Sequence, residues 1–238
     1  MVEREREEVG EPRQLTFDLP HLPAFEAEDF VVSACNQHAV DLIESWPAWP
    51  ANAAVVAGPP GSGKSHLVSV WLARSGGTAT TMAELSSETI ETFAKTPRLA
   101  VEDVAAGRGA EPERLLFHLL NQARESGGNL LLTMRQPPGE LDIALPDLRS
   151  RLRAAPIARI EPIDDALLSA LLIKLFADRQ LAIDPGVVKY LTRHLERTAE
   201  AARQTIDRID RLALATHRKV TRQLAAEALA AGVEPGED

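Results

Sequence analysis

The sequence predicts an α/β fold in which helices flank a parallel sheet, followed by a small all-helical domain. In the first two thirds of the chain, short apolar runs alternate with amphipathic stretches, a pattern typical of a parallel sheet covered by helices. Beyond Pro162 the apolar spacing is helical only. We therefore expect a flexible tail at residues 1–22, an α/β domain at 23–161 and a helical domain at 162–238.

A glycine-rich loop joins the first apolar strand, at 53–57, to a helix-forming segment at 65–74. The loop fits the pattern Gly-x-x-x-x-Gly-Lys-Ser, in which backbone N–H groups surround phosphate oxygens. Lys64 then reaches the β- and γ-phosphates, the Ser65 hydroxyl can hold Mg²⁺, and the helix directs its positive end at the same phosphates. The predicted nucleotide-binding residues of the loop are Gly58, Pro59, Pro60, Gly61, Ser62, Gly63, Lys64 and Ser65.

Two acidic residues end the short apolar strand at 99–103. In a P-loop protein, a carboxylate in this place supports Mg²⁺, and its neighbour can orient or deprotonate the attacking water. Glu102 takes the first position and Asp103 the second, so both are catalytic candidates. Ser65 and Glu102 are the predicted metal-binding pair, and we expect ADP or ATP with Mg²⁺ as cofactors.

The spacing of apolar residues predicts the remaining helices and strands, and proline or paired glycines end several of them. Further strands are predicted at 78–82 and 130–133. Further helices are predicted at 36–46, 86–94, 111–126, 164–179, 185–195, 199–217 and 221–231.

Composition excludes several classes of protein. Cys35 is the only cysteine, so no internal disulfide can form, and no histidines are spaced as metal ligands. No apolar run approaches the ~20 residues of a membrane span, and the charged N-terminus does not resemble a signal segment, so we expect a cytoplasmic protein without membrane contact. The net charge of −9 argues against bulk non-specific DNA binding. Only 193–222 is locally basic, which a solvated helical face also explains.

The segment 14–19 alternates apolar and polar residues and is stopped by Pro20. One interpretation is a short strand. The other is a linear motif that docks into a groove of a partner protein, with alternate side chains filling pockets. Its place near a free end favours docking.

Several arginines allow both a structural and a functional interpretation. Three arginines recur at a spacing of two, at Arg149, Arg151 and Arg153. They can form a solvated charged face, or one of them can be an arginine finger. Arg197, considered alone, is typical of surface arginines on helices.

Taken together, these features resemble the AAA+ ATPases of the DnaA group over nearly the whole chain. The segment 29–33, together with Asn36, is similar to the adenine-side segment of that group, which implies that Phe30 and Val31 contact the nucleotide. The loop at 58–65 resembles Walker A, and Glu102 with Asp103 resembles the Walker B acids. The implied fold is a P-loop AAA+ core with a small helical lid domain.

Three further segments extend the resemblance. The stretch 133–138 is similar to the sensor 1 strand and its double proline. The stretch 148–152 resembles Box VII, which implies that Arg151 is the arginine finger, and 197–202 resembles the sensor 2 helix, which implies that Arg197 faces the nucleotide. Departures occur at Glu102, where the group usually has aspartate, and at Arg135, where DnaA has an acid.

Within this group, the regulatory inactivators of DnaA resemble the chain best. The resemblance implies that Gln14, Leu15, Phe17 and Leu19 bind the sliding clamp of DNA polymerase III. It further implies DnaA as a partner whose bound ATP is hydrolysed, allows a homo-oligomer, and leaves no room for a sequence-specific DNA-binding domain. A helicase loader of the DnaC type and a small-molecule P-loop kinase are the alternative functions. The sequence alone leaves the working nucleotide and self-hydrolysis open.

Overall fold

Five parallel strands form the central sheet of the protein. The computed structural model describes residues 30–105 and 109–231, so the segment 14–19 lies outside the described residues. The sheet order is β2-β3-β4-β1-β5, and every pairing is parallel. The strands are β1 (Ala53–Ala57), β2 (Thr78–Thr81), β3 (Arg98–Val104), β4 (Asn129–Met134) and β5 (Ile157–Arg159). Because all strands run in one direction, their carboxyl ends meet at one edge.

Helices cover both faces of this sheet, as the alternation of strands and helices predicts. One face carries α1 (Gln37–Glu44) and α2 (Lys64–Ser75). The other carries α3 (Ser87–Lys95), α4 (Ala110–Ser126) and α5 (Pro146–Ala154), and a short 3₁₀ turn, η2 (Met82–Glu84), follows β2. The α/β fold class is therefore confirmed.

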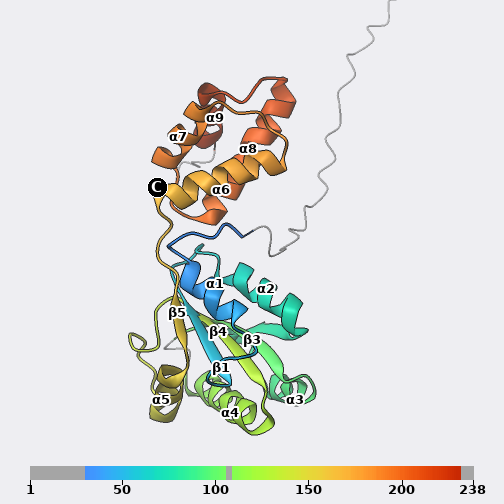
Figure 1. The fold of residues 1–238 in the computed structure, drawn as a ribbon, viewed down its shortest axis with the longest axis vertical. Coiled ribbons are helices and arrows are strands. Elements are labelled where there is room, and N and C mark those ends of the chain that lie inside the picture. The colour runs from blue at the N-terminus through green and yellow to red at the C-terminus, as the bar shows by residue number, and fades with distance from the viewer. Residues whose placement is uncertain (1–29, 106–108, 232–238) are drawn as a thin grey trace, which may run out of the picture.

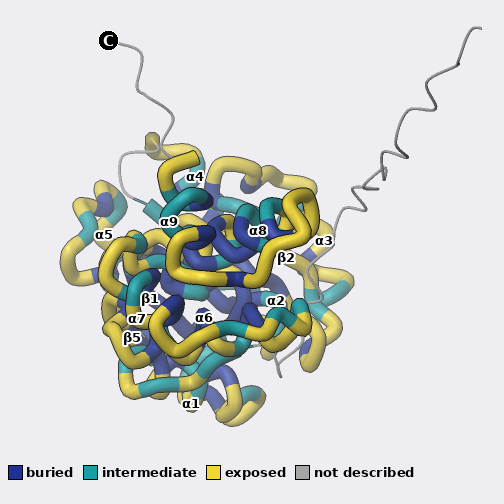
Figure 2. Tube along the Cα trace, turned by 90° about the horizontal axis from the view of Figure 1, so that it is seen from above, coloured by how far each residue is buried: buried dark blue, intermediate teal, exposed yellow. Residues whose placement is uncertain are grey.

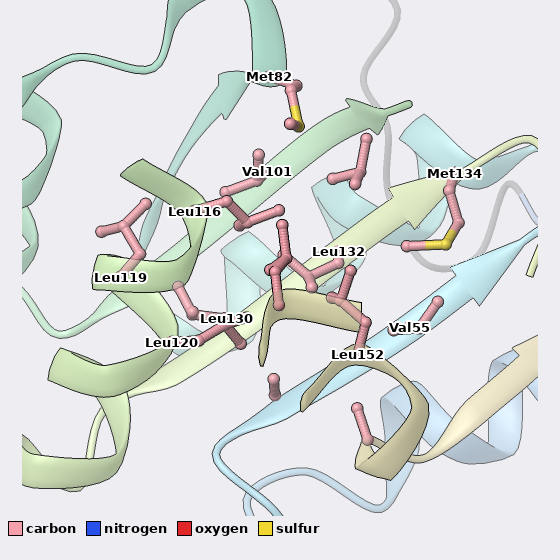
Figure 3. Close-up of a cluster of buried hydrophobic side chains, with 14 of the residues drawn as sticks. Val55, Met82, Val101, Leu116, Leu119, Leu120, Leu130, Leu132, Met134 and Leu152 are labelled. Carbon is pink, nitrogen blue, oxygen red and sulfur yellow. The ribbon is translucent and has the colours of Figure 1, made fainter. Parts of the chain in front are cut away.

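Alternate side chains of the central strands point into two separate cores. On β1, Val55 belongs to the core under α4 and α5, whereas Val56 belongs to the core under α1 and α2. Figure 3 shows the first core, where Val101 and Leu132 of neighbouring strands face Leu116 of α4. Full burial of each such side chain contributes about 1.5–3 kcal/mol. The sheet is thereby fixed rigidly behind the loops at its carboxyl edge.

Four further helices pack around a core of their own. They are α6 (Asp165–Asp178), α7 (Pro185–His194), α8 (Ala199–Thr216) and α9 (Arg222–Ala230), and they gather at one end of the molecule (Figure 1). Viewed from that end, buried residues lie along the inner sides of α6 and α8, and exposed residues lie outside (Figure 2). No helix in 30–105 and 109–231 is long and apolar enough to cross a membrane. The proposed domain boundary at 161/162 stays a prediction.

The segment 30–36, called the strap here, runs between the helical group and the sheet (Figure 1). Phe30 packs against the core on the α1 and α2 face, whereas Val31 and Cys35 pack against the core of the helical group. The Glu161 N–H also donates to the Cys35 carbonyl oxygen at 2.8 Å. The strap thus contacts both parts of the molecule next to the glycine-rich loop.

Candidate nucleotide site

The glycine-rich loop lies at the carboxyl end of β1 and leads directly into α2. Gly61 and Gly63 have φ angles of 70° and 95°, which L side chains rarely adopt. A Cβ on Gly61 would lie 2.8 Å from the Thr198 Cβ, and a Cβ on Gly63 would lie 2.9 Å from the Phe30 Cε2. Only glycine therefore fits both positions, because the strap covers one side of the loop and the start of α8 covers the other.

Lys64 begins α2 and is buried, with 8% of its surface exposed. Its Nζ donates hydrogen bonds to the carbonyl oxygens of Gly58 and Pro59, each at 2.8 Å. Burial lowers the pKa of Lys64; the Asp103 carboxylate opposes this effect, and the Arg135 guanidinium adds to it. A buried ammonium whose hydrogen bonds go to neutral carbonyls has no directly bonded counter-charge, so phosphate oxygens would be better partners.

The two predicted metal-binding residues lie side by side. The Ser65 Oγ donates a hydrogen bond to the Glu102 Oε2 at 2.6 Å, although the residues come from α2 and β3. Among the described residues, no three His, Cys, Asp or Glu side chains form a group that could hold a metal ion. The Ser65 and Glu102 oxygens fit Mg²⁺ nonetheless, because this ion commonly takes one or two carboxylates and completes its shell with phosphate oxygens and water.

A β-bulge between Val101 and Val104 contains Asp103, the second of the two acidic residues. Asp103 there has a φ of 54°, in the left-handed region, and its N–H donates to the Thr133 Oγ1 at 3.3 Å. Thr133 is a buried residue of β4, so the bulge is fixed to the neighbouring strand. The Asp103 side chain is exposed, as a group that must reach a water molecule requires.

The strap is held in place by one buried amide. Asn36 is 3% exposed; its Oδ1 accepts the Ser33 N–H at 2.8 Å, and its Nδ2 donates to the Val31 carbonyl oxygen at 2.9 Å. The Phe30 ring stacks on the His66 ring, with centroids 5.0 Å apart. The segment predicted to lie beside adenine is therefore placed against the loop and the first turn of α2.

A pocket of about 300 Å³ lies between the loop, the strap and the helical group. Val31, Ile163, Leu167 and Leu171 give it an apolar wall, and the loop residues 61–65 give it a polar end. Such a division suits a ligand with a flat apolar base and a charged phosphate chain. The N–H of Ala199, the first residue of α8, also donates to the Gly61 carbonyl oxygen at 3.3 Å.

Two arginines near the start of α8 have different surroundings. Arg197 pairs with Asp165 at 2.7 Å, has 53% of its side chain exposed and is not among the residues that line the pocket. Arg203 lines the pocket, and its guanidinium makes no hydrogen bond or ion pair with any other residue in the described part of the chain. Sequence reasoning missed Arg203. The sequence signal that could have identified it is Thr198, a residue type that caps helices. Thr198 begins α8 after Arg197, and the helical spacing then places Glu200 and Arg203 on one face.

The predicted arginine finger lies apart from this pocket. Arg151 belongs to α5, is partly buried, and its Cζ lies 5.6 Å from the centroid of the Phe117 ring. Neither Arg149, Arg151 nor Arg153 is among the residues that line the pocket. These arginines therefore do not line the pocket beside the loop of their own chain.

Comparisons with solved structures identify the fold, whereas no family model matches the sequence. Domain III of the replication initiation protein DnaA from Thermotoga maritima is similar, with a TM-score of 0.75 and 19% identity over 90% of this chain and 98% of that one. AMPPCP-bound DnaA from Aquifex aeolicus gives a TM-score of 0.67 and 16% identity over 87% of this chain and 80% of that one. The fold is that of the AAA+ domain of DnaA.

A branch-migration protein carries the same fold. A RuvB variant from Thermotoga maritima has a TM-score of 0.68 and 14% identity over 87% of this chain and 72% of that one. The expected DnaA-like AAA+ fold is therefore confirmed.

Proposed function

We propose that this AAA+ protein is a DnaA-related regulator of replication that binds ADP or ATP with Mg²⁺ in the pocket beside the loop. The observation that carries the proposal is the buried Lys64 ammonium, which donates its hydrogen bonds to neutral carbonyls in a pocket with one apolar wall. The AMPPCP bound to DnaA of Aquifex aeolicus supports an adenine nucleotide as the ligand class.

Each part of the pocket has a role in this proposal. Phe30 and Val31 hold the base against the apolar wall, and the N–H groups of residues 58–65 hold the phosphates. Ser65 and Glu102 hold Mg²⁺, which neutralises charge that develops on the phosphates. Asp103 orients a water molecule, so a slow hydrolysis is compatible with the site.

The arginines of α8 give the first test. We expect Arg203→Ala to weaken ADP affinity tenfold or more, because a charged hydrogen bond contributes about 1.5–3 kcal/mol. Arg197→Ala should change affinity less, because Arg197 already pairs with Asp165 on the surface. Calorimetric titration of ADP into both variants measures the difference. A larger loss in Arg197→Ala would restore the original assignment of Arg197 as the nucleotide-facing arginine.

We further propose that the chain acts as Hda does, as a regulatory inactivator of DnaA. In this scheme the segment 14–19 places the protein on the sliding clamp, and Arg151 completes the ATP site of a neighbouring DnaA. The absence of Arg151 from the lining of its own pocket supports this role, because a finger supplied to another molecule acts outside the site of its own chain. A DnaC-like helicase loader would use the same pocket, so pull-down with clamp, DnaA and helicase, with and without nucleotide, separates the two functions.

The clamp interaction predicts a specific loss. Replacing Gln14, Leu15, Phe17 and Leu19 by alanine should abolish clamp binding without lowering the melting temperature. The apolar anchors would contribute roughly 1.5–3 kcal/mol each when buried in the clamp. Surface plasmon resonance on immobilised clamp measures binding, and Thr16→Ala/Asp18→Ala in the same segment is the control. Survival of clamp binding, together with a markedly lower melting temperature, would show that the segment is a core strand.

A further inference from the structure

A second cluster of basic side chains lies on the helical group and takes no part in the nucleotide site. Lys189, Arg193 and Arg222 are exposed and surround a hollow of about 280 Å³ on α7 and α9. We call these three residues, with Tyr190 and His194, the basic patch. No acidic side chain of the described residues lines this hollow.

Aromatic contacts fix the middle of the basic patch. The Tyr190 and His194 rings stack with centroids 4.2 Å apart, and the His194 Nδ1 lies 2.8 Å from the Tyr190 carbonyl oxygen. The Arg222 Cζ lies 5.1 Å from the centroid of the Tyr190 ring. A guanidinium that lies over a ring keeps its in-plane N–H groups available for acceptors. Arg222 is therefore oriented before any ligand arrives.

The cations of the basic patch differ from most of their neighbours because they have no acidic partner in the part of the chain that the structure describes. Elsewhere on the helical group, Arg218 pairs with Glu227, Lys174 with Asp178, and Arg179 with Asp207. Lys189 and Arg193 make no hydrogen bond or ion pair with another described residue. They lie one helical turn apart on α7, a spacing that puts Cβ atoms about 5–6 Å from each other.

Two acids beside the basic patch are already engaged. Asp165 lines another hollow together with Lys189 and Arg193, but it pairs with Arg197. Asp184 caps α7 by accepting the Gly186 N–H at 2.7 Å. In a chain of net charge −9, three cations around a hollow that no carboxylate of residues 30–105 and 109–231 lines form a local positive field.

We propose that the basic patch binds the phosphodiester backbone of duplex DNA without reading its sequence. Its chemistry is that of a phosphate site: two arginines and a lysine on one face, with an aromatic ring that positions one of them. The inference rests on the proposed function, because a protein held on a DNA-loaded clamp has the duplex within reach. The net charge of −9 opposes association from solution, so the contact gains most when tethering raises the local concentration.

Fluorescence anisotropy with a labelled duplex tests the proposal on the full chain. At about 50 mM salt, Lys189→Ala/Arg193→Ala should weaken binding roughly tenfold and reduce the slope of log K against log salt by about 0.9 for each lost phosphate contact. Lys95→Ala/Arg124→Ala removes the same charge from exposed sites on α3 and α4 and is the matched control. An equal loss in the control, or no binding of duplex by the wild type, would overturn the proposal.

Two further measurements separate the outcomes. Labelled ADP should bind Lys189→Ala/Arg193→Ala as it binds the wild type, because neither residue lines the nucleotide pocket. If the wild type binds duplex through the basic patch but does not bind ADP, the nucleotide proposal fails and the DNA proposal stands. If polyglutamate competes for the basic patch better than an equal charge of duplex, an acidic protein is the partner and the DNA proposal is wrong.

Discussion

Arg151→Ala should retain nucleotide and clamp binding and lose the stimulation of ATP hydrolysis by DnaA. An arginine supplied to a neighbouring P-loop site accelerates phosphoryl transfer by ~10³–10⁵, because it stabilises charge on the transferring phosphoryl group. The fold should survive the change, since the contact of the partly buried Arg151 with the Phe117 ring contributes about 0.5–2 kcal/mol. The assay is turnover of DnaA-bound ATP on clamp-loaded DNA.

Arg151→Lys is the more demanding variant. We expect it to fail as Arg151→Ala does, because an ammonium is a point charge and lacks the planar fork of the guanidinium. Arg149→Ala and Arg153→Ala are controls on the same helix with the same loss of charge. Wild-type stimulation by Arg151→Ala, combined with loss in either control, would move the finger to that neighbour.

Lys64→Ala should abolish binding of ADP and ATP while the sheet stays folded. The ammonium supplies positive charge to the phosphates, whereas its hydrogen bonds within the protein go to the carbonyl oxygens of Gly58 and Pro59. Its burial lowers its pKa, so the charged form costs free energy in the fold, and its removal should leave the melting temperature nearly unchanged. Affinity for labelled ADP and a thermal melt measure the two effects. Unchanged affinity would contradict the assignment of the loop.

Local sequence signals predicted most of the sheet and the phosphate end of the site. A strand, a glycine-rich loop and a helix follow one another directly at 53–75, so their order can be read from one continuous segment. β5 was missed because its three residues bury only Ala158 and pair with β1 alone. A run this short carries no periodicity.

The base end of the site depends on contacts between distant segments. Thr198 and Ala199 meet the loop at Gly61 across more than half of the chain, and that contact places Arg203 at the pocket. Apolar spacing identifies α8 as a helix but does not specify which turn of it meets the loop. The bulge at Asp103 could not be predicted from local sequence either, because the Asp103 N–H donates to Thr133 on the neighbouring strand.

Equilibrium titration of the purified full chain with fluorescent ADP in the presence of Mg²⁺ tests the central claim most directly. We expect saturable binding at one site, displaced by unlabelled ADP or ATP and weakened when Mg²⁺ is chelated, because Ser65 and Glu102 hold the ion beside the phosphates. The absence of saturable binding, or binding that adenine nucleotides do not displace, would contradict the claim that this pocket is a nucleotide site.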